Sequence, residues 1–290
     1  MSKPKVHHYV PQFYLRRFVD AAGRLWVWDR DRDRTFAATP NSIASESNFY
    51  LLPELAEFGH DPLTLEKQFC GLESVSAITG QWLELIRAGE ALDRIPILKS
   101  NREVASLFIV LQFLRTADTR SFLARFAAAD IAQPTASSSY SRSLHADVLW
   151  DDALVNSFRQ QVESSTWVFA KNETGSPYVT SDNPVSFRTS NNRQWTKARM
   201  LNSDSYVVYP LAPDAILYCY PRKGRWHGKN IEQFDCRISP VITTPGMITS
   251  ENSAQVFMAS RFVVSNNSDF TEERRFARTI DSDIYAPRGN

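Results

Sequence analysis

The chain has 290 residues, of which 33 are Lys or Arg and 32 are Asp or Glu, and its formal net charge is +1 at pH 7. This balance excludes a protein that coats polyanions through bulk positive charge and one that carries an acidic tail. Hydrophobic residues make up 43% of the chain and charged residues 22%, which excludes intrinsic disorder for most of its length. We therefore expect a globular protein with a sizeable core in one or two domains.

The sequence gives no sign of a membrane span, a signal peptide or a disulfide framework. The best apolar stretch, 107–114, is interrupted by Gln112 and is far shorter than the roughly 20 residues that a membrane helix needs. The first segment, MSKPKVHHYVPQF, lacks an apolar run of signal-peptide length, so we expect a cytoplasmic protein without a membrane partner. Cys70, Cys219 and Cys236 are odd in number and far apart, which argues against disulfides and against a cysteine zinc site.

The first third of the chain predicts a short helix, a hairpin and a long helix. Pro11 suits the first turn of a helix, and the apolar residues after it predict a helix over 11–19. Alternating side chains predict strands at 25–29 and 35–38, joined by an exposed turn. Apolar residues at helical spacing then predict one amphipathic helix from about 63 to 92.

Helices are also expected in the middle of the chain. Ser100 and Glu103 have the spacing of a capping box, and the run 104–114 is apolar on nearly every side. We expect this helix at the centre of the core. The Ser-rich segment 134–143 predicts a mobile loop, and a further helix is expected over about 146–163.

After Thr166 the pattern changes to short strand-like runs separated by prolines. Helices in one half and strands in the other predict an α+β fold rather than an alternating α/β fold. The predicted strands cover 167–170, 178–181, 206–209, 215–220 and 261–265.

Seven short motifs follow one another along the chain. They are HHYVPQFYLRRF, GRLWVWDR, IASESNFY, VLQFLRT, YVTSDNP, YPLAP and SRFVVSNN. Together they resemble a bacterial family known only as domain of unknown function 4238, from residue 7 to about 267. The resemblance implies one family unit, a single α+β domain over 1–290, with the Ser-rich segment outside every motif. It implies no catalytic mechanism.

His7 and His8 stand side by side just before the first predicted helix. In such a pair one imidazole can bind a cation while its neighbour takes a proton from water near neutral pH. The string HHYVP resembles the opening of HNH-type nucleases, but the nearest Asn and His that could complete that motif, Asn48 and His60, are far downstream. The alternative is structural: one histidine caps the helix start or packs under the hairpin.

Three carboxylates are further candidates for functional residues. Glu66 and Glu73 are seven residues apart, so both would lie on one side of their helix, at the border of its apolar stripe. A carboxylate there either lines a cleft or is simply half-exposed. Asp182, in the segment TSDNP, ends a strand at a turn, where it is either a metal ligand or a partner of the turn backbone.

Basic residues suggest where an anion would bind. Arg115 ends the buried helix with Gln112 one turn before it, and a guanidinium in that position needs an anion. The anion is either Asp118, three residues later, or a bound phosphate or carboxylate. Residues 188–229 hold eight Lys or Arg, two Asp or Glu and six aromatic residues, which suits either one nucleic-acid-binding face or scattered positions.

These residues lead to three hypotheses. In the first, the protein is a divalent-metal-dependent phosphodiester hydrolase that acts on nucleic acid or another phosphate-containing ligand. Its metal ligands are His7, Asp182 and Glu66, its metal is Mg²⁺, Mn²⁺ or Zn²⁺, its general base is His8, and Arg115 binds the phosphate. In the second, a non-catalytic module uses the same residues to bind a small anionic ligand or a protein partner. In the third, they form a buried hydrogen-bond network.

Overall fold

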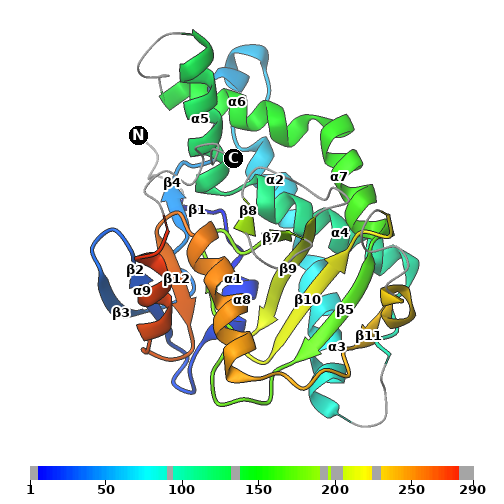
Figure 1. The fold of residues 1–290 in the computed structure, drawn as a ribbon. Helices are drawn as coiled ribbons and strands as arrows, with labels where there is room; N and C mark the ends of the chain where they lie inside the picture. The colour runs from blue at the N-terminus through cyan, green and yellow to red at the C-terminus, as the bar shows by residue number, and fades with distance from the viewer. Residues whose placement is uncertain are drawn as a thin grey trace.

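The structure, a computed structural model, describes residues 6–89, 94–131, 138–189, 195–196, 205–223 and 230–280. Helices and strands are mixed, as the α+β prediction requires (Figure 1). None of the helices in these ranges is long and apolar enough to cross a membrane.

The largest sheet of the described chain has six strands in the order β11-β5-β10-β9-β7-β8. Neighbouring strands are antiparallel, except that β11 runs parallel to β5. The strands are β5 (Thr166–Lys171), β7 (Ser186–Thr189), β8 (Trp195–Thr196), β9 (Ser205–Ala212), β10 (Ala215–Tyr220) and β11 (Arg237–Ile238).

Two smaller sheets join the start of the chain to later segments. Four strands form the order β3-β2-β12-β6, so the N-terminal hairpin pairs with a strand from the far end of the chain. A two-stranded sheet, β1-β4, holds the histidine pair. The strands are β1 (Val6–His8), β2 (Leu25–Asp29), β3 (Arg34–Ala38), β4 (Ser45–Ser47), β6 (Thr180–Ser181) and β12 (Phe262–Ser265).

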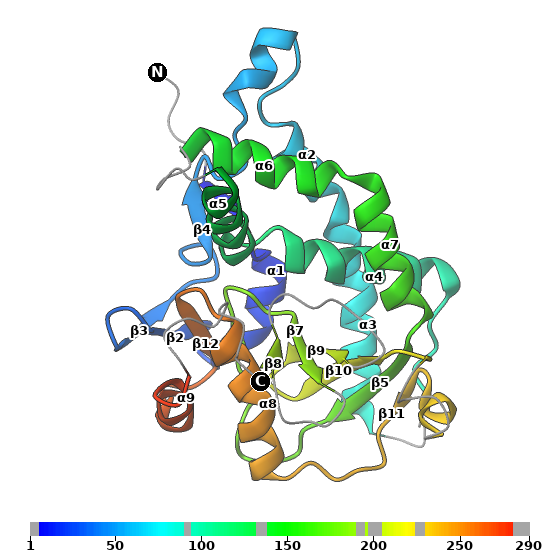
Figure 2. The same ribbon diagram turned by 45° about the horizontal axis from the view of Figure 1, so that its top comes forward.

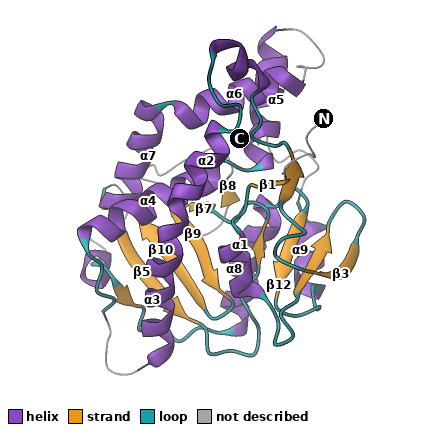
Figure 3. Cartoon of the chain, turned by 180° about the vertical axis from the view of Figure 1, so that it is seen from behind, coloured by secondary structure: helices purple, strands orange, loops and turns teal. Residues whose placement is uncertain are grey.

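Helices lie on both faces of the large sheet. Figure 3 shows α3 and α4 crossing one face, and α8 lies on the opposite side in Figure 1. In Figures 1 and 2, α5 and α6 lie together, away from the sheet. The helices are α1 (Gln12–Leu15), α2 (Thr64–Cys70), α3 (Ser74–Ala88), α4 (Lys99–Leu114), α5 (Ala117–Ile131), α6 (Ser138–Trp150), α7 (Asp152–Ser164), α8 (Pro245–Met258) and α9 (Thr271–Ala277), with 3-10 turns η1 (Arg16–Phe18), η2 (Pro53–Phe58), η3 (Gly71–Glu73) and η5 (Ile231–Phe234).

Alternate residues of the large sheet face two different hydrophobic clusters. Trp167 and Phe169 of β5 belong to the main core, where Trp82 of α3 packs edge-on against both rings. Val208 of β9 belongs to the second cluster, with Ile248 of α8. The period of two along each strand therefore places one helical layer on each face.

The helix α4 lies in the main core, as predicted, and buries Phe108, Ile109 and Leu114. Its predicted capping box is wrong. The helix begins one residue before Ser100, and its first turn is exposed, so water can satisfy the N–H groups that a capping box would bond. Glu103 instead pairs with Arg159 of α7 at 3.3 Å.

Two predicted helices are each broken into two. The segment 63–92 forms α2, the turn η3 and α3, with the break at Gly71, and residues 90–93 lie outside the described ranges. The segment 146–163 is divided at Asp151, whose carboxylate accepts a hydrogen bond from the backbone N–H of Leu154 at 2.9 Å and so caps α7.

Other elements differ from the predictions. Residues 138–143 of the predicted mobile loop begin α6, and 134–137 lie outside the described ranges. The strand-rich half also contains α8, which was missed because it is buried on most sides and shows no amphipathic pattern. Its start did carry a signal, since Thr244 caps the helix and Pro245 occupies its first turn.

Candidate functional site

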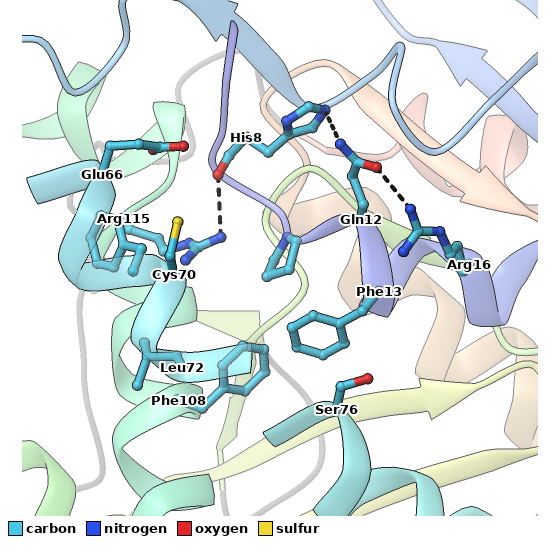
Figure 4. A pocket seen from close by; sticks show the side chains of 12 residues that line it. His8, Gln12, Phe13, Arg16, Glu66, Cys70, Leu72, Ser76, Phe108 and Arg115 are labelled. Carbon is cyan, nitrogen blue, oxygen red and sulfur yellow. Dashed lines mark hydrogen bonds between the residues drawn. The ribbon is translucent and has the colours of Figure 1, made fainter. Parts of the chain in front are cut away.

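A pocket of about 460 Å³ opens between β1, α1, α2 and the end of α4 (Figure 4). Its volume is in the range typical of small-molecule sites. Of the predicted site residues, it contains His8, Glu66 and Arg115. The rest of its lining is Pro11, Gln12, Phe13, Arg16, Phe69, Cys70, Leu72, Ser76 and Phe108.

The chain turns at Pro11 from β1 into α1, and this turn builds one wall of the pocket. Pro11 is extended, with φ −62° and ψ 139°, and α1 begins at the next residue. Tyr14 and Leu15 are fully buried and anchor the short helix in the core. Gln12 at the start of α1 and Arg16, which follows its last residue and begins η1, are therefore held at the pocket.

Arg115 is only 4% exposed and is held by main-chain oxygens. Its Nε donates to the carbonyl of Tyr9 at 2.8 Å, and its Nη2 donates to the carbonyl of His8 at 3.2 Å. Within the described chain, its Nη1 makes no hydrogen bond. Burial lowers the pKa of Arg115, and the nearby charge of Glu66 acts in the opposite direction.

Of the two anions considered for Arg115, Asp118 does not form the ion pair. Among the described residues, no carboxylate forms an ion pair with this guanidinium. Asp118 instead accepts a hydrogen bond from Asn183 at 3.2 Å, because α5 begins directly after the turn at Arg115 and directs Asp118 elsewhere. Gln112 donates to the same Tyr9 carbonyl as Arg115, at 3.0 Å, so both side chains hold the connection after β1.

His8 is half-buried beside the carbonyl of Asn41, which lies 3.2 Å from its Nε2. A carbonyl only accepts hydrogen bonds, so Nε2 carries the proton of the neutral ring and Nδ1 has the lone pair. Burial lowers the pKa of His8, which favours this neutral form. The Nε2 atoms of Gln12 and His8 are 3.5 Å apart, and the Gln12 Oε1 accepts from Arg16 at 3.0 Å.

The opposite wall comes from α2. Glu66 is half-buried in its first turn, and Cys70, an exposed free thiol, is its last residue. Phe69 lies beneath the guanidinium of Arg115, with 4.8 Å between the Arg115 Cζ and the ring centroid. This wall therefore places an acid, a thiol and an aromatic ring next to the buried cation.

His7 faces the core rather than the pocket. It is completely buried, and its Nδ1 accepts a hydrogen bond from the backbone N–H of Tyr50 at 2.8 Å. Its ring stacks on that of Tyr50, with 6.0 Å between centroids and 10° between planes. The alternation of β1 explains the separation, since neighbouring histidines on a strand point to opposite faces.

Asp182 is also buried away from the pocket and binds the backbone that leads into β12. Its carboxylate accepts three main-chain N–H bonds of 2.8 to 3.0 Å, from Ser260, Arg261 and Phe262. Burial raises the pKa of Asp182 to about 6, and these three bonds act in the opposite direction. Both oxygens are thus engaged by the protein itself.

The structure does not bring the three predicted metal ligands together. His7 and Asp182 lie outside the pocket that contains Glu66. In the described part of the chain, no group of three or more His, Cys, Asp or Glu side chains is placed to hold a metal ion.

Much of the basic, aromatic segment 188–229 lies outside the described ranges. Arg188 pairs with Glu251 of α8 at 2.8 Å and lies over the ring of Trp195. Tyr206 is 3% exposed and packs against Tyr220. Within the described ranges, these basic and aromatic side chains thus contact other residues of the protein. Many residues of the predicted basic face lie outside those ranges.

Comparison with known proteins gives one assignment. The model of a family described as a protein of unknown function, DUF4238, matches residues 6–269. The chain belongs to the DUF4238 family. No curated protein and no solved structure matches it. The family assignment confirms the resemblance seen in the sequence motifs, and it adds no activity.

In this DUF4238 protein, the sequence interpretation missed four polar residues of the pocket, namely Gln12, Arg16, Cys70 and Ser76. Gln12 begins α1 and Arg16, four residues later, begins η1, and this helical spacing was the available signal. Cys70 had no local signal, because a single cysteine on a surface helix has the same pattern whether or not a pocket lies beside it.

Proposed function

We propose that this DUF4238 protein binds a small anionic ligand in the pocket, with Arg115 as its main contact. The observation that carries the proposal is the buried guanidinium of Arg115, which forms no ion pair with a carboxylate of the described residues. Neutral carbonyls satisfy part of its hydrogen bonding, but they do not compensate a buried charge as an anion does.

Other residues of the pocket support an anion in the same place. Arg16 adds a second, exposed cation, and Gln12 adds an amide donor close to it. An arginine can donate two parallel hydrogen bonds to a carboxylate or phosphate. Against these cations stands one carboxylate of the lining, that of Glu66, so the lining favours a negative group overall.

Calorimetric titration tests this proposal with inorganic phosphate and benzoate as probes. We expect Arg16→Ala and Arg115→Gln to weaken binding by about tenfold or more, because each removes a charged donor. Arg275→Ala is the matched control, since Arg275 is an exposed arginine on α9 outside the pocket. Equal affinities in wild type and both pocket variants would refute the proposal.

Phosphodiester hydrolysis remains a second candidate, because His8 shares the pocket with Arg115 and burial keeps its imidazole neutral. A neutral imidazole is the form that accepts a proton from water. Of the predicted metal ligands, Glu66 alone lines this pocket. The test is cleavage of DNA or RNA with Mg²⁺, Mn²⁺ or Zn²⁺, in which His8→Gln should lose at least about 10²-fold in rate. No cleavage with any of these metals would exclude this candidate.

A further inference from the structure

The pocket contains a negative group beside its buried cation. Glu66 and Arg115 lie on the same side in Figure 4, whereas Gln12 and Arg16 lie on the other. Glu66 is half-buried, so water screens its charge only in part. The negative group of a ligand is therefore attracted by Arg115 and, more weakly, repelled by Glu66. A ligand that also carries a positive group there is attracted by both residues.

Part of the lining between these polar residues is apolar and aromatic. Phe13 of α1 and Phe108 of α4 form a tilted ring pair with 5.6 Å between centroids. Figure 4 shows these rings between the two polar walls, and Leu72 extends the apolar surface. An inorganic anion would leave these rings facing water, whereas an aromatic ligand body would cover them.

From these contacts we infer that the ligand is a zwitterion with an aromatic or large apolar body, of the chemical class of an aromatic α-amino acid. Its carboxylate binds Arg115, its ammonium group binds Glu66, and its ring packs against Phe13 and Phe108. In an α-amino acid the two charges are separated by one carbon, which matches a cation and an acid on the same wall. This inference rests on the proposed function, since it takes Arg115 as the anion contact.

Three probes that each contain one phenyl ring separate the contribution of the ammonium group to binding from that of the carboxylate. L-phenylalanine carries both charges, 3-phenylpropanoate lacks the ammonium group, and 2-phenylethylamine lacks the carboxylate. We expect calorimetric titration to give about tenfold tighter binding for L-phenylalanine than for 3-phenylpropanoate, the size of one charged hydrogen bond. 2-phenylethylamine should bind most weakly, because it has no carboxylate to bind Arg115 and its positive charge is repelled by that residue.

The variant Glu66→Gln then locates the ammonium contact. We expect the advantage of L-phenylalanine over 3-phenylpropanoate to fall below about twofold in this variant, while 3-phenylpropanoate binds at least as tightly as before. Glu57→Gln is the control, because Glu57 is an exposed acid outside the pocket and should keep the full advantage. Thermal melting checks that both variants fold.

The outcomes distinguish the two proposals. Equal binding of L-phenylalanine and 3-phenylpropanoate, or an advantage that Glu66→Gln leaves intact, would overturn the zwitterion and leave anion binding in place. If phosphate, benzoate and 3-phenylpropanoate all fail to bind, or bind without dependence on Arg16 and Arg115, the anion-binding function itself is overturned.

Discussion

Arg115 donates a hydrogen bond from its Nη2 to the main-chain carbonyl of His8, over 3.2 Å. The cation that lines the pocket thus also holds the end of β1, on which the pocket histidine lies. Binding and stability are linked at this residue, so the two effects must be measured separately.

Arg115→Lys should lower the free energy of unfolding by roughly 1 to 3 kcal/mol, because one ammonium group does not reproduce the fork that bonds the carbonyls of Tyr9 and His8. Arg16→Ala, at an exposed position of the same pocket, should change it by less than about 0.5 kcal/mol. Urea denaturation measures both values. Similar losses in the two variants would contradict a special structural role for Arg115.

Asp182→Asn should destabilise the protein by about 1 to 3 kcal/mol. An asparagine has one carbonyl oxygen, and its NH₂ group would face at least one of the three backbone N–H groups that now donate to Asp182. Urea denaturation of the variant checks this. A tolerated substitution would mean that the carboxylate is not needed to hold the backbone before β12.

His145 should make stability depend on pH. Its Nε2 donates to the carbonyl of Leu114 at 2.8 Å, its Nδ1 accepts from Arg120 at 3.2 Å, and burial lowers its pKa from 6.5 to about 3. Between these values the unfolded chain binds the extra proton at this residue, so the contribution of His145 to the free energy of unfolding falls as pH falls, by up to roughly 1.4 kcal/mol per unit.

The check is urea denaturation of wild type and His145→Gln at several values between pH 4 and 7. Glutamine does not titrate, so the slope of the free energy of unfolding against pH should change by the equivalent of about one bound proton in the variant. The variant should also be less stable at pH 7. An unchanged slope would show that His145 is not buried in its neutral form.

Cys70 should be the fast-reacting thiol of the native protein. It is exposed at the pocket, whereas Cys219 and Cys236 are buried, and burial raises the pKa of Cys219 to about 12. A thiol with a raised pKa has little reactive thiolate at neutral pH. We expect a disulfide reagent to modify one thiol quickly and the other two only in denaturant, with the fast phase lost in Cys70→Ser.

The same reaction reports on the pocket. A ligand bound beside Arg115 should slow the modification of Cys70 in wild type and leave the rate unchanged in Arg115→Gln. Faster or unaltered modification of wild type at saturating ligand would place the ligand elsewhere.

Local patterns were enough to predict several elements of this fold. The strands predicted at 25–29 and 215–220 coincide with β2 and β10, and the helix predicted at 104–114 is the buried part of α4. In each of these segments, the side chains that become buried are spaced by the geometry of the element itself. The short motifs were likewise enough to predict the family, because each is a contiguous run of residues whose recognition needs no tertiary contact.

Tertiary structure alone decided what the polar residues do. Asp182 binds backbone 78 to 80 residues away, and Arg115 binds a carbonyl 106 residues away. A local pattern reveals that such a group is present at a strand or helix end, but its partners depend on which distant segments pack beside it. For the same reason the sequence grouped His7 with His8, whereas the pleat of β1 sends one ring into the core and the other to the pocket.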